Sequence, residues 1–225
     1  MTMNWVRAFE IPKISIDRRT LVVYGNHRPA DLGEMFAVLT PDEIACVSRI
    51  RSSIQRKTWI SCHVTLRIML GNWLGMNPSD VEICKNRFGR PFLANSNLFF
   101  SLSHTNSSYL LGFSFAGKIG VDIEELSEED DLNELIEYAF SKEEADFCKN
   151  GNLHDRFLEI WTFKEAFLKA TGVGLVNELK SVNVAGKLNN LPDSMKFKQS
   201  TFVCPGGETG SIVFRGTDPV RCIWY

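Results

Sequence analysis

The segment IGVDIEE, residues 119–125, predicts a strand with two carboxylates on one face. Residues i and i+2 of a strand point to the same side, so Asp122 and Glu124 should project together. Val121 and Ile123 would then face the core. Two parallel carboxylates repel each other unless a cation or a proton lies between them. An isolated pair of this kind is more often an exposed strand end, so the strand alone does not define a site.

A second segment, WTFKEAFLKA at residues 161–170, supplies a partner for these acids. Its pattern is helical, and Glu165 and Lys169 fall on one stripe together with Trp161. Such an acid–lysine pair is by default a surface contact worth about 0.3 to 0.5 kcal/mol. Large apolar groups share this stripe, however, so we expect the pair at the edge of a buried interface. Three carboxylates and a lysine there suit Mg²⁺, which prefers oxygen ligands and often shares a substrate phosphate.

The composition indicates a globular protein of one large domain or two small ones. The chain has 225 residues, of which 44% are hydrophobic, enough to form a core. The formal net charge of -2 gives no overall basic field for nucleic acid or membrane, and neither is expected as a partner. The six cysteines show no zinc-type spacing, and we expect reduced thiols. The N-terminal sequence has no apolar signal core, so a cytoplasmic location is expected.

Capping and turn signals divide the chain into helices and strands. Apolar runs at 14–16 and 21–24 suggest a strand, and residues 40–43 predict a capped helix start, with one or two helices reaching about residue 74. Residues 81–123 are typical of strands and tight turns in an antiparallel meander. An acidic loop is expected at 127–133. Helical segments should follow at 135–140, from a start at 141–144, and at 161–170. A second meander of strands is expected at 182–184, 194–203, 211–214 and 222–225.

A faint internal repeat suggests two similar halves. The mutual spacing of Trp59, Leu66 and Arg67 recurs at positions 161, 168 and 169. Each set lies on a predicted helix followed by strands, so each half would be a helix packed on an antiparallel sheet, an α+β fold. We place the N-terminal half at residues 1–116 and the C-terminal half at residues 117–225.

Basic and polar residues outside the two segments give weaker signals. The first long helix carries a basic region that includes Arg56 and Arg67, which is either a solvated cationic face or a phosphate-binding surface. Arg90 stands in a GRP turn, where glycine allows close backbone approach and arginine can grip a phosphate. His104 ends the strand segment SLSH, and a lone histidine is more often structural than catalytic.

Taken in order and at about these distances, GRP, SLSH, IGVDIEE, FSKEE and WTFKEAFLKATGVGL resemble the 4′-phosphopantetheinyl transferases of the Sfp, or surfactin-synthetase-activating, type. The resemblance covers roughly residues 41–175. It implies transfer of the phosphopantetheine arm of coenzyme A to a serine of an apo acyl or peptidyl carrier protein, with Mg²⁺, releasing 3′,5′-ADP. It also implies a pseudo-twofold pair of subdomains with coenzyme A in the cleft between them, so that a monomer is expected.

The resemblance also implies roles for single residues. Asp122, Glu124 and Glu165 would hold Mg²⁺, and Glu165 would take the proton of the carrier serine, either directly or through a water. Lys169 would stabilise the leaving phosphate and could protonate it. Glu125 should point away from the two strand acids. Contacts to the phosphates and adenine of coenzyme A are expected from Lys169 and from a further set, Arg56, His63, Arg90, His104 and Lys164.

Two features depart from the family's pattern. His63 stands on the first helix where the family often has arginine, and histidine is only partly charged near neutral pH. Binding of the 3′-phosphate of coenzyme A would then be weaker, or Arg56 or Arg67 would bind this phosphate instead. The acidic loop at 127–131 opens the region where such enzymes meet the carrier. We therefore expect either a less acidic carrier or contact through apolar residues of the next helix, Leu132, Leu135 and Ile136.

Two other functions would use the same residues. A Mg²⁺-dependent phosphohydrolase or nuclease would employ the three acids, but it usually needs a water-activating base and often a second metal. The near-neutral net charge of the chain also argues against a surface that binds nucleic acid. A non-catalytic protein that binds carriers or coenzyme A is disfavoured because the acids and Lys169 are all present. Identifying the reaction products would distinguish the transferase, the hydrolytic enzyme and the non-catalytic protein.

Overall fold

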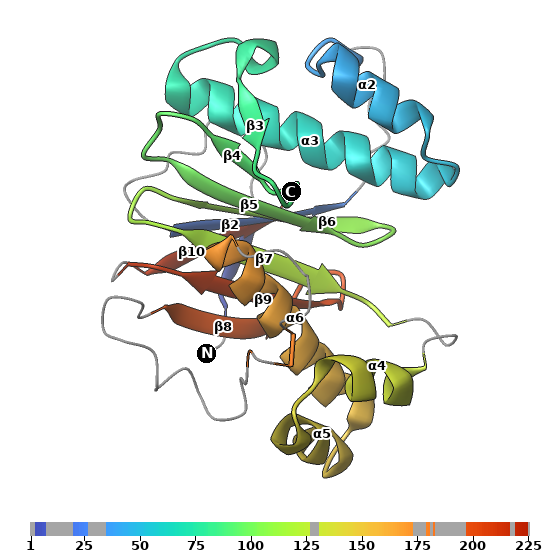
Figure 1. The fold of residues 1–225 in the computed structure, drawn as a ribbon. Helices are drawn as coiled ribbons and strands as arrows, with labels where there is room; N and C mark the ends of the chain where they lie inside the picture. The colour runs from blue at the N-terminus through green and yellow to red at the C-terminus, as the bar shows by residue number, and fades with distance from the viewer. Residues whose placement is uncertain are drawn as a thin grey trace.

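The computed structural model describes residues 3–7, 20–26, 35–126, 131–172, 179–180, 182, 197–216 and 219–224. Within these ranges the chain is an α+β protein with five α-helices and three β-sheets (Figure 1). The predicted α+β class is confirmed. The runs at 14–16, 127–130, 183–184 and 194–196 lie outside the described residues. In the part of the chain that is described, no helix is both long and apolar enough to cross a membrane.

Two helices follow the predicted start at Thr40. They are α2 (Pro41–Ser48) and α3 (Ser53–Leu74). The Thr40 hydroxyl accepts the backbone N–H of Glu43, and the Glu43 carboxylate accepts the backbone N–H of Thr40, so the predicted capping box is confirmed. The longer helix α3 ends at Gly75, whose φ of 68° places it in the left-handed region that glycine tolerates.

One face of α3 covers a five-stranded sheet (Figure 1). The strand order is β1-β10-β2-β6-β5. The last strand of the chain inserts between two N-terminal strands and runs parallel to both. The boundary that we expected at residues 116 and 117 is therefore crossed by this strand. The five strands are β1 (Trp5–Arg7), β2 (Thr20–Asn26), β5 (Phe99–His104), β6 (Ser108–Ser114) and β10 (Val220–Trp224).

A second, antiparallel sheet has the order β7-β9-β8, and it corrects the predicted meander. Its strands are β7 (Ile119–Glu124), β8 (Lys198–Val203) and β9 (Thr209–Phe214). Although β7 follows β6 in sequence, it does not join the five-stranded sheet. Its backbone pairs with β9, and it packs against β5 and β6 of the first sheet. A shared apolar core lies between the two sheets, including Val22, Leu110 and Val121. Strand periodicity is the same in either sheet, so it could not reveal the change of layer.

Short elements precede this change of sheet. A 3-10 turn, η2 (Pro78–Asp80), leads into the hairpin of β3 (Ile83–Lys85) and β4 (Pro91–Leu93). The GRP turn thus connects β3 to β4, and the glycine at position 89 has a φ of 79°. That left-handed backbone explains why glycine stands there.

Three helices follow β7; the first two lie at the other end of the molecule, and the third runs from there toward its middle (Figure 1). They are α4 (Leu132–Ala139), α5 (Lys142–Lys149) and α6 (Leu153–Thr171). The predicted capping box between Ser141 and Glu144 is confirmed, and α6 ends at Gly172 with a φ of 79°. The long helix α6 packs on β7 and β9, while α4 and α5 contact α6. Each larger sheet thus carries one long helix, whereas the pseudo-twofold relation itself stays a prediction.

Candidate active site

Helix α6 and strand β7 meet backbone to backbone at Gly120. A Cβ at this position would overlap the carbonyl oxygen of Ala166 and crowd the backbone N–H of Ala170. Only glycine therefore allows the helix to lie this close. The approach brings the acids of β7 next to the polar stripe of α6. Our sequence reasoning did not use Gly120, although a glycine inside a strand often marks a close backbone approach.

Lys169 and Asp122 form the central contact of the site. Lys169 Nζ lies 2.7 Å from Asp122 Oδ1 and donates to Ser103 Oγ at 2.9 Å. The Ser103 hydroxyl in turn donates to the same Asp122 oxygen at 2.8 Å. The Asp122 side chain is 3% exposed and that of Lys169 is 29% exposed, so a partly exposed lysine pairs with a buried carboxylate. The sequence assigned Ser103 no role because its partners lie 19 and 66 positions away in the chain.

The remaining acids lie in low-dielectric surroundings beside this contact. Burial raises the pKa of Glu165 to about 7, and the charge of Asp122 adds to the effect. Burial likewise raises the pKa of Glu124 to about 7, with further contributions from Asp122 and Glu165 that Lys169 opposes. The three predicted acids are therefore close enough to interact electrostatically. Keeping all of them ionised is costly without a further cation.

The donor atoms fit a hard cation. Oδ2 of Asp122 is buried and finds no hydrogen-bond partner among the described residues. Carboxylate oxygens are the donors that Mg²⁺ prefers, and Glu124 and Glu165 provide more of them. Over the same described ranges, however, no group of three His, Cys, Asp or Glu side chains is placed so that it could hold a metal ion. The three acids therefore do not converge on one metal position in this structure.

A cavity of about 480 Å³ opens beside Glu124. Its walls come from the α2–α3 region, the β5–β6 turn and the end of β7. Glu125 lines it as well, directly after the last residue of β7, and the direction of its side chain relative to Glu124 stays a prediction. No lysine or arginine belongs to the described lining, which consists of Cys46, Ile50, Gln55, Trp59, His104, Thr105, Asn106, Glu124 and Glu125.

The expected coenzyme A residues of α3 lie near this cavity without facing it. The His63 ring stacks on Trp59 with centroids 3.5 Å apart, and its Nδ1 lies 3.0 Å from the Trp59 carbonyl oxygen. Burial lowers the pKa of His63 to about 4, so the ring is neutral at physiological pH. Arg56 donates through Nη2 at 2.6 Å to the carbonyl oxygen of Ile50, a residue of the cavity lining, and is not itself part of that lining. His104 lines the cavity directly, and burial lowers its pKa.

Arg67 is not available to a phosphate. Its guanidinium forms an ion pair with Glu43 at 2.7 Å and donates to the carbonyl oxygens of Pro78 and Val81 at 3.0 and 3.1 Å. Only 3% of its side chain is exposed. Arg67 therefore holds α2, α3 and η2 together, and the expectation that it could replace an arginine at position 63 is wrong.

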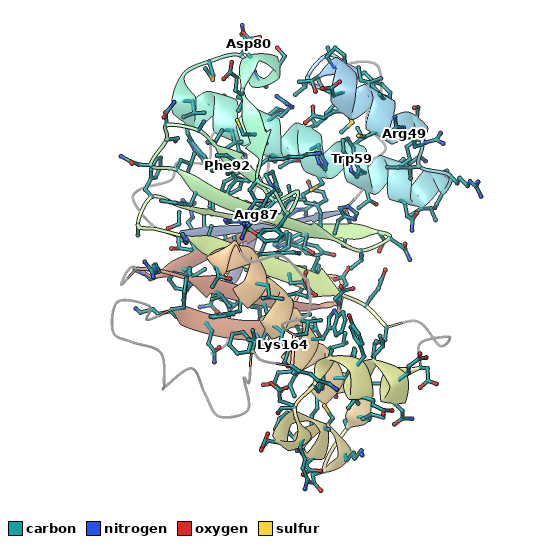
Figure 2. All side chains as sticks on the ribbon, viewed as in Figure 1. Arg49, Trp59, Asp80, Arg87, Phe92 and Lys164 are labelled. Atoms are coloured by element: carbon teal, nitrogen blue, oxygen red, sulfur yellow. The ribbon has the colours of Figure 1, made fainter. Side chains whose placement is uncertain are left out.

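Lys164 also departs from its predicted place beside the phosphates. It is fully buried and forms an ion pair of 2.6 Å with Glu144 on α5. Figure 2 shows Lys164 where α4 covers α6. Consecutive helix residues point about 100° apart, so the side chain next to Glu165 in sequence faces a different neighbour. The prediction that Lys164 adds charge at the phosphates is wrong.

Arg90 lies at the other end of β7 from Glu124. Its Nη2 donates to the Ile119 carbonyl oxygen at 3.1 Å, and its Nε is buried without a partner among the described residues. Arg90 and Lys118 line a second cavity of about 260 Å³, together with Asn86, Phe92 and Phe99 among others. Arg90 and His104 thus line different cavities on either side of the acids.

Helix α4 presents a different surface from the one expected. Leu132 and Ile136 are 6% and 4% exposed and belong to the core around α6, so they cannot offer the predicted apolar contact. Leu135 is half-buried, and Tyr138 is 65% exposed. The tyrosine was not singled out because the sequence does not show how the helix is rotated.

Comparison with known proteins gives a consistent result. Residues 118–203 match the 4′-phosphopantetheinyl transferase superfamily. The 4′-phosphopantetheinyl transferase HetI of Nostoc sp. is 32% identical over 163 residues, which cover 69% of this chain and 68% of the relative. An L-aminoadipate-semialdehyde dehydrogenase-phosphopantetheinyl transferase of Candida glabrata is 29% identical over 73% of this chain and 68% of its own length. The 4′-phosphopantetheinyl transferase ffp of Bacillus subtilis is 30% identical over 54% of each chain.

Proposed function

The chain belongs to the 4′-phosphopantetheinyl transferase superfamily, and we propose that it transfers the phosphopantetheine arm of coenzyme A to a serine of an apo carrier protein. The second product would be 3′,5′-ADP. The reaction would require Mg²⁺. The strand and the helix of the site come from one chain, so the protein would act as a monomer.

The contact between Lys169 and Asp122 is the observation that carries this proposal. It joins a lysine to a buried carboxylate at 2.7 Å and leaves Asp122 Oδ2 without a partner among the described residues. Phosphoryl transfer depends mainly on positioning and on neutralising charge at the phosphate oxygens. A fixed cation beside a vacant carboxylate oxygen suits that requirement.

Asp122, Glu124 and Glu165 would hold the Mg²⁺. When bound, the metal would neutralise charge on the pyrophosphate of coenzyme A. The raised pKa values of Glu124 and Glu165 support this assignment, because a divalent cation would offset the cost of keeping both carboxylates ionised. Glu125, which lines the cavity, has no role in this assignment.

Glu165 would act as the general base. Its carboxylate lies beside Asp122 and Lys169, where it would accept the proton of the carrier serine. As the proton moves to Glu165, the serine oxygen forms a bond to the phosphorus that bears the pantetheine arm. The bond from that phosphorus to the bridging pyrophosphate oxygen breaks, and its electron pair leaves with 3′,5′-ADP.

Lys169 would stabilise the departing phosphate. Its side chain is 29% exposed, so it would reach a ligand while Asp122 and Ser103 hold its ammonium in place. It could also donate the proton that the leaving group needs. Ser103 would therefore act as a positioning residue for Lys169.

Coenzyme A would contact both cavities. One is lined by His104 and the other by Arg90, and the acids of β7 lie between them. A ligand that reaches both would pass its pyrophosphate over Asp122. Arg56 and His63 would contribute through the cavity wall, by supporting Ile50 and Trp59, rather than by direct charge.

Mass spectrometry of carrier proteins tests the proposed function. The purified protein is mixed with coenzyme A, excess Mg²⁺ and a panel of apo carriers from fatty-acid, polyketide and peptide synthesis. At least one carrier should gain a phosphopantetheine arm while an equal amount of 3′,5′-ADP forms, and a chelator should prevent both. Breakdown of coenzyme A without any gain in carrier mass would contradict the proposal and indicate hydrolysis. So would a folded protein that binds coenzyme A but modifies no carrier.

A further inference from the structure

Lys164 precedes Glu165 in sequence, but its side chain points into the protein. Its Nζ donates to the carbonyl oxygens of Ala139 at 2.9 Å and Leu179 at 2.7 Å. It also forms the ion pair of 2.6 Å with Glu144 Oε2, and both side chains are 0% exposed. The ammonium therefore has an acceptor for each of its three N–H bonds.

The three acceptors belong to three separate segments. One ends α4, one lies on α5, and one follows α6. Glu144 Oε2 additionally accepts the backbone N–H of Ser141 at 2.7 Å, within the capping box of α5. Lys164 thus ties α6 to residues 139–144, which we name the α4–α5 corner.

Stability alone is a poor explanation for this buried pair. Removing two charges from water costs free energy that their attraction repays only with excellent geometry, and an apolar pair of similar size is often as stable. Three directional contacts do, however, fix the rotation of a helix about its axis. Holding Lys164 toward the corner leaves Glu165, about 100° further round, directed toward Asp122. On the other side of Glu165, Gly120 holds the helix close at Ala166.

We propose that Lys164 and Glu144 are a positioning pair that fixes the rotation of α6 and thereby the place of Glu165 beside Asp122. Neither residue touches the substrate, and both act through Glu165. The catalytic consequence rests on the proposed function. The effect on the helix does not, and it can be measured without any transfer reaction.

Hydrogen–deuterium exchange of the full chain measures that effect. Lys164→Met and Glu144→Gln each remove one charge with little change in size. Exchange at the amides of residues 162–168 should rise about tenfold or more in both variants, because the helix loses its anchor. The matched controls Lys149→Met and Glu159→Gln alter exposed residues of α5 and α6 and should leave exchange unchanged. Exchange that rises only within residues 139–144 would overturn the proposal.

A further control separates positioning from general stability. Ile136→Ala removes apolar contacts of α4 in the same core without touching the pair. We expect it to lower the melting temperature about as much as Glu144→Gln but to speed exchange in α4 alone. If Ile136→Ala loosens residues 162–168 equally at the same melting temperature, the pair is only structural and the proposal fails.

Kinetics then tests the consequence for catalysis. In variants shown to be folded at the assay temperature, kcat should fall by about 10- to 100-fold, with KM for coenzyme A unchanged within about threefold. The double variant Lys164→Met/Glu144→Gln should lose no more than the worse single variant, because both act through one contact. Unchanged kcat in both single variants would contradict the proposal. A wild-type protein without transfer activity would refute the proposed function, while exchange would still decide on the pair.

Discussion

Lys169 Nζ lies 2.7 Å from Asp122 Oδ1, although the two residues are 47 positions apart in sequence. The contact connects the helix that carries Glu165 to the strand that carries the other acids. It also shows that the lysine is held by a carboxylate and a serine hydroxyl before any substrate binds. The Lys169 ammonium is thus held in place in advance, while Asp122 Oδ2 is left for another ligand.

Replacing this lysine should harm both catalysis and stability. Lys169→Met would lower turnover by about 10²- to 10³-fold, the usual effect of losing one donor to a developing negative charge. It would also cost about 1 to 3 kcal/mol of unfolding free energy, because Asp122 stays buried with a weaker partner. Steady-state kinetics and urea unfolding measure the two effects. Lys149→Met is the exposed control and should change neither quantity.

Glu165→Gln should separate catalysis from folding. The amide keeps the size of the side chain but cannot take the serine proton, so turnover should fall by about 10²- to 10⁴-fold. In a chelator at about pH 8, the variant should be at least as stable as the wild type, because a buried carboxylate with a raised pKa no longer has to ionise. Glu159→Gln, an exposed change on the same helix, should keep full activity. Retained turnover in Glu165→Gln would remove it from the mechanism.

Stability of the metal-free protein should depend on pH. The native pKa values of Glu124 and Glu165 are raised from 4.5 to about 7, so the native state binds more protons than the unfolded state between these values. The unfolding free energy should therefore fall as pH rises through this window. Thermal unfolding at about pH 5 and about pH 8 in a chelator measures this fall. The double variant Glu124→Gln/Glu165→Gln should flatten it.

Mg²⁺ should reverse that loss at the higher pH. A ligand that binds only the native state raises stability as its concentration exceeds its dissociation constant. We expect excess Mg²⁺ to raise the melting temperature of the wild type at about pH 8 and to have little effect on Asp122→Asn. An equal rise in both proteins would place the metal elsewhere.

Gly120→Ala should displace α6 from β7. The added methyl group would overlap the carbonyl oxygen of Ala166, and backbone cannot move aside as a flexible side chain can. We expect a loss of about 3 kcal/mol or more and a matching fall in turnover. Gly75→Ala is the control: its Cβ meets open space, and the left-handed backbone costs only about 1 to 2 kcal/mol. Equal losses in the two variants would contradict a special role for Gly120.

His63→Gln should barely change the use of coenzyme A. Burial keeps the histidine neutral, with a pKa of about 4, so it gives no charge to a 3′-phosphate. KM for coenzyme A should stay within about threefold of the wild type between about pH 6 and pH 8. His104→Gln alters a residue of the cavity wall and should raise KM more. A large rise in KM for His63→Gln alone would show a direct contact.

Much of the candidate site could be predicted because it follows local periodicity. The two-residue period of β7 and the four-residue spacing on α6 place Asp122, Glu124, Glu165 and Lys169 without knowledge of any other segment. The capping boxes at Thr40 and Ser141 were also predictable, since their partners lie three residues apart.

Contacts between distant segments decided the rest. The sequence by itself determined which side chains share a face of β7 and of α6, because that depends on backbone geometry alone. Only the tertiary structure decided that β7 pairs with β9, that β10 joins the first sheet, and that Lys164 faces Glu144 instead of the site. A buried strand has the same pattern in either sheet, and a helix residue carries no local sign of which neighbour will cover it. Packing among residues far apart in the chain supplied that information.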